Sequence, residues 1–141
     1  MRLDLYQAET ARIAHAQTGL LDGARAALLS GATLTPLELN GVLHAIQVLA
    51  ENAIGKAKRL LKAANEPVPV SAHDAFAGLA RHHGMTADEL REWNRIVGLR
   101  NRIVHDYMNI DMDRVLELVR DGGYRRLSEF LLAPVDSGNS N

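Results

Sequence analysis

The 141-residue sequence has no cysteine and no long apolar run. Without cysteine the chain can form no disulfide framework, thiol nucleophile or thiolate metal site, which is compatible with a reducing cytoplasm. No stretch of about 18 apolar residues is present to cross a membrane. The first ten residues carry acids and polar side chains where a signal peptide needs an apolar core. These absences favour a cytoplasmic protein that contacts no membrane.

The sequence also has no excess of charge of either sign. Sixteen Lys and Arg oppose seventeen Asp and Glu, so broad electrostatic capture of nucleic acid is not expected, and any contact with RNA requires a local basic cluster. The sequence contains no H-E-x-x-H motif, P-loop or G-x-G-x-x-G motif, and its histidines have no convincing metal-ligand spacing. We therefore expect no metal and no cofactor.

The pattern that is present is helical almost throughout. The length suits one domain, which we place at residues 1–133, and the polar segment 134–141 is predicted to be a disordered tail. No internal repeat and no strand-like alternation is found. The sequence therefore predicts an all-α protein, an antiparallel helical bundle with short additional C-terminal helices.

Two long helices are expected first, over residues 3–29 and from Thr35 to about Ala64. Thr35, Pro36 and Glu38 form a start signal for the second helix. We expect the first helix to bury one stripe, made of Leu5, Ala8, Ile13, Ala16, Leu20, Ala24 and Leu28. The cations in the last turns of the second helix are predicted to form a solvated helix end, with an RNA-binding patch as the alternative; they are Lys56, Lys58, Arg59 and Lys62.

Shorter helices follow a proline-containing linker at residues 65–70. Ser71 is the predicted cap of a helix that ends near Gly84, and Thr86 with Glu89 caps the next one. Trp93 in that fourth helix is expected in the core or at a dimer interface. Two further helices are predicted, one from Asn109 or Asp111 to residue 121 and one over residues 124–132.

The most informative segment is residues 100–107, at the end of the fourth helix. Arginine presents a planar fork of donors to phosphate, and histidine can exchange a proton near neutral pH. On an ideal helix Arg100 and His105 lie ~7.5 Å apart along the axis and ~140° apart around it, whereas Asn101 and His105 share a face. Convergence of Arg100 and His105 on one phosphate therefore requires a helix that loosens near His105 or a second copy of the chain. The simpler interpretation is that Arg100 and Asp106 form surface ion pairs and His105 caps the helix.

This segment matches the R-x4-H-x-Y motif, in which Arg100 is followed by four residues, His105, one residue and Tyr107. The chain from about residue 3 to 132 resembles HEPN domains of the HepT-like toxin type. This resemblance implies a metal-independent endoribonuclease that acts on RNA as a homodimer, with both motifs in one cleft. It assigns proton transfer to His105 and transition-state stabilisation to Arg100. Asn101 would orient the phosphate or His105. Arg102 and Asp106 are supporting candidates for RNA contact or imidazole orientation.

Tyr107 has a separate role in proteins of this type. The resemblance implies silencing by a cognate MntA-like nucleotidyltransferase antitoxin that attaches AMP to this tyrosine, which would place an anion near the catalytic cations. A half-buried tyrosine that packs against the helix end is the simpler interpretation. Some HEPN proteins are not nucleases, so the alternative function is a non-catalytic helical partner that binds a nucleotidyltransferase or a nucleotide.

Overall fold

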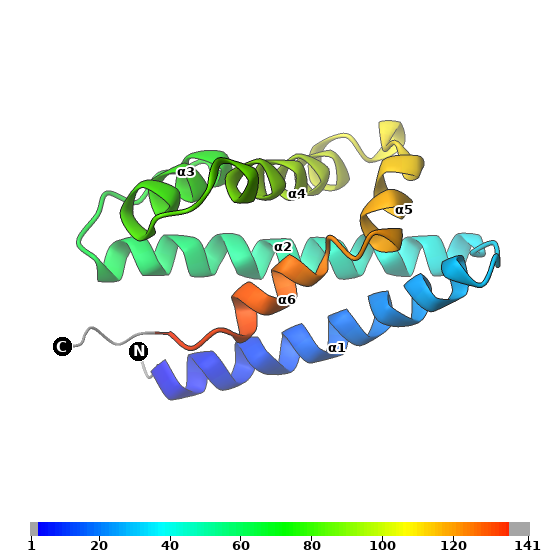
Figure 1. Cartoon of the computed structure of the whole chain (residues 1–141), viewed down its shortest axis with the longest axis horizontal. Coiled ribbons are helices and arrows are strands. Elements are labelled where there is room, and N and C mark those ends of the chain that lie inside the picture. The colour runs from blue at the N-terminus through cyan, green and yellow to red at the C-terminus, as the bar shows by residue number, and fades with distance from the viewer. Residues whose placement is uncertain (1–2, 136–141) are drawn as a thin grey trace.

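The computed structural model describes residues 3–135 and shows an all-α bundle within that range (Figure 1). The helices are α1 (Leu3–Leu29), α2 (Pro36–Ala63), α3 (Ala72–His83), α4 (Ala87–His105), α5 (Met112–Arg120) and α6 (Arg125–Leu132), with a 3-10 turn η1 (Tyr107–Asn109) after α4. The predicted fold class is confirmed. Residues 136–141 of the predicted tail lie outside the described residues.

The long helices α1 and α2 run antiparallel side by side, and α3 and α4 form a second layer against α2 (Figure 1). From the end of α4 the chain turns back through α5 and α6, and α6 packs against both α1 and α2. Across residues 3–135 no helix combines the length and apolar character needed to span a bilayer. This arrangement leaves the C-terminal end of α4 at one end of the bundle.

Local capping explains why the helices begin where the sequence predicts. Thr35 Oγ1 accepts from the Glu38 backbone N–H at 3.1 Å, and the Glu38 carboxylate accepts from the Thr35 backbone N–H at 2.8 Å. Thr86 and Glu89 form the same reciprocal pair at the start of α4. Such caps satisfy N–H groups that have no partner inside the helix. The start of α4, and with it the position of its last turn, is therefore fixed by local sequence.

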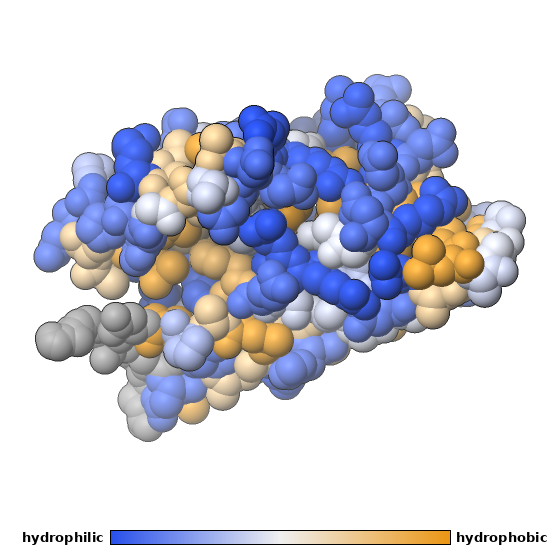
Figure 2. Space-filling model, in the orientation of Figure 1, coloured by the Kyte–Doolittle hydropathy of each residue, from blue (hydrophilic) through white to orange (hydrophobic). Residues whose placement is uncertain are grey.

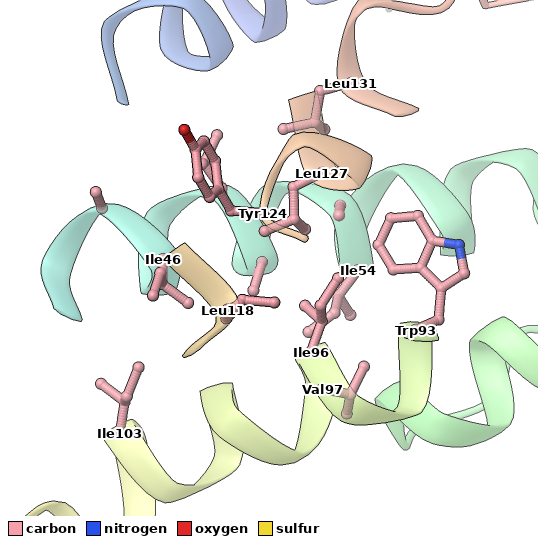
Figure 3. Close-up of a cluster of buried hydrophobic side chains, with 14 of the residues drawn as sticks. Ile46, Ile54, Trp93, Ile96, Val97, Ile103, Leu118, Tyr124, Leu127 and Leu131 are labelled. Carbon is pink, nitrogen blue, oxygen red and sulfur yellow. The ribbon is translucent and has the colours of Figure 1, made fainter. Parts of the chain in front are cut away.

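One side of α4 faces the core, as Figure 3 shows for Trp93, Ile96, Val97 and Ile103. Trp93 is buried and stacks on Phe76, with ring centroids 4.3 Å apart and an interplanar angle of 12°. Its prediction as a core residue is confirmed within the chain. Burial of this side fixes the rotation of α4 about its axis and so determines which residues of the motif face outward.

The buried stripe predicted for α1 is wrong over most of its length. Leu5 and Leu20 are each 61% exposed, whereas Thr10, Ala14 and Leu21 are buried. The inward face of α1 includes polar side chains, among them Thr10, which is buried, and Gln7, whose Nε2 donates to the Leu131 carbonyl at 3.3 Å. Because the prediction selected apolar residues, it chose a stripe rotated away from the face that packs.

The predicted solvated cation cluster at the end of α2 is also wrong for Lys56. This side chain is only 2% exposed, and its Nζ donates to the carbonyl oxygens of Phe130 and, at 2.7 Å, Ala133. Burial lowers the pKa of the Lys56 ammonium. The carbonyls at the C-terminal end of α6 have no hydrogen-bond donor within that helix, so the ammonium from α2 supplies the missing donor.

Candidate active site

The last turns of α4 and the start of α3 enclose a shallow groove of about 440 Å³. All of the predicted site residues except Tyr107 line it. The lining side chains that carry polar chemistry are Ser71, His73, Arg100, Asn101, Arg102, His105 and Asp106. The fold therefore brings the predicted catalytic pair and its supporting residues to one concave surface.

Helix α4 remains regular through His105, so the loosening expected near this residue is not found. The helix ends at Asp106, whose φ of −148° leaves the helical region while its N–H still donates to the Arg102 carbonyl at 2.9 Å. Arg100 and His105 nevertheless border the same groove. Both residues therefore border one surface without a distortion of the helix.

The Arg100 guanidinium is held by two neighbours. Its Nε donates to Glu51 Oε2 at 3.0 Å and its Nη2 donates to Glu51 Oε1 at 3.3 Å. Its Nη1 donates to Asn101 Oδ1 at 2.8 Å. Arginine has five N–H bonds, so one remains on each terminal nitrogen. These two donors remain available to the oxygens of a phosphate.

The His105 imidazole has no hydrogen bond or ion pair with any residue in the range 3–135, and the residue is exposed. The capping role considered from the sequence therefore has no support in its contacts. Both ring nitrogens are open to a substrate. A proton carrier must reach the reacting oxygen directly or through one water, and nothing in the described part of the chain blocks this ring.

Asp106 does not contact the His105 ring and instead organises the rim of the groove. One carboxylate oxygen accepts from Arg102 Nη1 at 3.1 Å, and the other accepts from Asn109 Nδ2 at 2.7 Å. Both partners are exposed, so the ion pair contributes little to stability. Its effect is geometric, because it ties η1 to the last turn of α4.

Tyr107 begins η1 and is 49% exposed. Its hydroxyl donates to Asn40 Oδ1 on α2 at 2.9 Å. Asn40 and Glu51 are eleven residues apart on α2, which corresponds to roughly 16 Å along the helix axis. The Tyr107 hydroxyl and the Arg100 guanidinium are thus attached to α2 at separate points.

The sequence analysis did not identify Glu51 or Asn40 as site residues. Eleven residues are close to three helical turns, so both side chains lie on one polar face of α2. That pattern is the only signal in the sequence, and it does not indicate which helix packs beside this face. Within residues 3–135, no group of three or more acidic or histidine side chains is placed to hold a metal ion.

Comparisons with known proteins show the family and the fold of the chain. The family model described as "Ribonuclease HepT-like" matches residues 24–133. The "mRNA nuclease HepT" of Shewanella oneidensis is 30% identical over 81 residues, which are 57% of this chain and 61% of that relative. A solved structure described as a crystal structure of a toxin-antitoxin with AMP-PNP has the same fold, with a TM-score of 0.70 at 19% identity over 93% of this chain and 99% of the other. The family match spans most of the bundle, and the chain therefore belongs to the HepT-like ribonuclease family.

Proposed function

We propose that this protein is the toxin of a toxin-antitoxin pair and acts as a metal-independent endoribonuclease through Arg100 and His105. The observation that carries the proposal is the groove that Arg100 and His105 both line, since the arginine keeps two N–H donors and the histidine ring has no partner among the described residues. The family membership and the relative named an mRNA nuclease support RNA as the substrate.

The reaction needs no metal, because RNA carries its own nucleophile in the 2′-hydroxyl. The 2′-oxygen forms a bond to phosphorus while the bond from phosphorus to the 5′-oxygen breaks. The 2′-hydroxyl loses its proton, the leaving 5′-oxygen gains one, and His105 carries out proton transfer in this exchange. Arg100 stabilises the additional negative charge on the pentacoordinate phosphate. The products are a 2′,3′-cyclic phosphate and a 5′-hydroxyl.

Glu51 and Asn101 are positioning residues in this proposal. Both fix the guanidinium of Arg100 through hydrogen bonds, and two of its five N–H donors remain free. A fixed donor pays its orientational cost before the substrate arrives, so it stabilises the transition state more than a mobile one does. The Glu51 carboxylate also offsets the positive charge of Arg100. The site therefore attracts RNA less strongly than an unpaired arginine would.

A homodimer in which both motifs share one cleft is the second part of the proposal. Apolar side chains near the motif support it, because Val104 and Met108 are 41% and 90% exposed and Leu37 at the start of α2 is 81% exposed. Figure 2 shows a further apolar area at the end of the bundle where α1 meets α2. A second copy of the chain would remove such surface from water.

Subunit mixing tests the shared cleft. Arg100→Ala and His105→Ala proteins are each expected to be inactive. If one site takes its arginine and histidine from different protomers, exchange of subunits between the two variants restores activity, because half of the sites in each mixed dimer are intact. A mixture that forms mixed dimers and remains inactive contradicts the shared site, although it leaves the catalytic roles in place.

An antitoxin nucleotidyltransferase that attaches AMP to Tyr107 is the third part. Tyr107 is half-exposed, and its hydroxyl has one side-chain partner within residues 3–135, Asn40, which suits the tyrosine as an acceptor of AMP. The phosphate of the attached AMP would lie near Asn40, so its adenosine would have to extend along α2 to cover Arg100. Intact mass after incubation with the nucleotidyltransferase and ATP should increase by one or more AMP groups. Tyr107→Phe should abolish this increase and Tyr6→Phe should not; an increase that survives Tyr107→Phe excludes the assignment.

RNA cleavage in the presence of EDTA tests the central chemistry. We expect the unmodified protein to cut RNA and to leave cyclic phosphate ends. If the unmodified dimer cuts no RNA but binds the nucleotidyltransferase, the non-catalytic partner function is correct.

A further inference from the structure

We propose that the cavity between α4 and α5 binds a nucleotide of single-stranded RNA that lies beyond the two nucleotides flanking the cleaved phosphate, with the RNA backbone crossing α4 at Gly98. The cavity has a volume of about 750 Å³ and is formed by the outer side of α4, the residues after η1 and the first turns of α5. Its size is in the range of nucleotide and ligand sites. The inference rests on the proposed ribonuclease function, since it assigns more of that substrate.

The cavity and the groove of the motif meet at α4. Gly98 and Arg102 line both of them. The groove continues from there to His105, and the cavity continues away from it toward α5. A ligand whose phosphate lies in the groove therefore reaches the cavity by crossing one glycine, and RNA is a ligand of that shape.

Gly98 has no packing reason to be glycine. It lies in the middle of α4, where glycine costs about 1 kcal/mol of helix stability relative to alanine. A Cβ atom built at this position has no atom within 4 Å. In other proteins, glycine permits the backbone of a ligand to approach the protein chain closely. Gly98 leaves such open surface at the point where the groove and the cavity join.

The walls of the cavity suit a nucleotide. Leu99 and Ile110 provide apolar surface that is partly buried against the core, and a flat base can pack against such a pocket wall. Arg114 provides a cation that is 78% exposed, and its only ion pair in the described chain is with Asp111 at 3.5 Å. Glu117 adds an acceptor for the amino group of a base. A nucleotide has an anionic backbone, a flat ring and hydrogen-bond donors, so it can contact the cation, the apolar surface and the acceptor of this cavity.

The Asp111 carboxylate does not oppose this use of Arg114. It caps α5 by accepting from the backbone N–H groups of Asp113 and Arg114 at 3.1 and 3.4 Å. Its charge is therefore compensated by the start of the helix. Arg95, at the other end of the cavity, is held by Glu92 and Asp121 and serves as wall.

Binding of RNA that cannot be cut tests the inference separately from catalysis. The probe is fluorescent 2′-O-methyl RNA, as a dinucleotide and as a hexanucleotide, titrated with the full-length protein. We expect Gly98→Gln and Arg114→Gln each to weaken binding of the hexanucleotide about tenfold, the scale of one base contact, and to change dinucleotide binding little. Gly98→Gln should fold with an equal or higher Tm, because glutamine forms helices better than glycine.

Gly19→Gln is the matched control, since Gly19 is also within a helix with open space around its Cα but lines neither the groove nor the cavity. It should leave both affinities unchanged. The inference is overturned if Gly98→Gln and Arg114→Gln leave the hexanucleotide affinity unchanged or weaken both lengths equally. AMP, UMP, CMP and GMP are titrated in the same way. The inference is also overturned if one of these mononucleotides binds as tightly as the hexanucleotide and loses affinity in the same variants, because the cavity then binds a free nucleotide.

The two proposals fail in different ways. Suppose that the wild-type protein cuts RNA but the two variants do not weaken hexanucleotide binding more than dinucleotide binding. The cavity assignment then fails and the ribonuclease function stands. If the wild-type protein cuts no RNA and the variants do distinguish lengths, the proposed chemistry fails and the RNA-binding cavity stands.

Discussion

The guanidinium of Arg100 on α4 donates two hydrogen bonds to the carboxylate of Glu51 on α2, with donor–acceptor distances of 3.0 and 3.3 Å. These residues are 49 positions apart in the sequence. The pair joins the motif helix to the longest helix of the bundle. It sets the direction of the two arginine donors that remain free, and so it defines the side from which a phosphate can approach.

Replacement of Glu51 by glutamine should therefore lower kcat. Glutamine keeps one acceptor oxygen but loses the second hydrogen bond and the charge, so Arg100 is held less firmly. We expect kcat for RNA cleavage to fall roughly 10- to 100-fold, the scale of a misplaced catalytic group. KM should stay equal or decrease, because removal of a carboxylate favours RNA binding.

Glu9→Gln provides the control for this prediction. Glu9 accepts a hydrogen bond from Arg12 Nε on α1 at 3.1 Å and lines neither the motif groove nor the cavity between α4 and α5. It should leave both kinetic constants unchanged. A Glu51→Gln protein with unchanged kcat and raised KM would show that Glu51 contributes to binding only, contrary to its proposed positioning role.

Lys56→Met should destabilise the bundle without affecting RNA binding. Methionine fills similar volume, but it leaves the Phe130 and Ala133 carbonyls without the donor they have now. Unpaired buried acceptors cost about 1–3 kcal/mol, so the free energy of unfolding in urea should fall by that amount. Amide hydrogen exchange in α6 should accelerate. An unchanged midpoint would mean that water replaces the ammonium at no cost.

Tyr124→Phe should change how stability depends on alkaline pH. Burial, together with the hydrogen bond to Asp22, raises the pKa of the Tyr124 hydroxyl to about 12. In the unfolded chain a tyrosine ionises near pH 10, so between about 10 and 12 the unfolded state loses its proton first. The wild-type protein should lose stability across this window. Tyr124→Phe, measured by thermal unfolding at a series of pH values, should lack this component of the loss; an identical slope in both proteins would contradict it.

Sequence patterns predicted α2 and α4 well because both begin at a local signal. Thr35 with Glu38, and Thr86 with Glu89, specify helix starts without information from elsewhere in the chain. The same local reasoning placed Asn101 and His105 on one face of α4. These features depend on residues within one or two turns of each other, which is the range that spacing can describe.

Features that depend on packing between distant segments could not be predicted in this way. The inward face of α1 contains Thr10, which an apolar stripe omits, and Lys56 is buried only because α6 returns over α2. The partner of Arg100 likewise follows from how α2 and α4 pack. The motif was visible in the sequence, whereas the residue that positions it was visible only in the fold.

Cleavage of RNA by Arg100→Ala and His105→Ala, compared with the wild-type protein, is the most direct test of the catalytic assignment. The initial rate should fall by at least about 100-fold in each variant, as expected for loss of a transition-state donor or of a proton carrier. Circular dichroism and Tm should remain close to those of the wild type, because both residues lie at the surface groove. Folded variants that cut RNA at the wild-type rate would contradict the account.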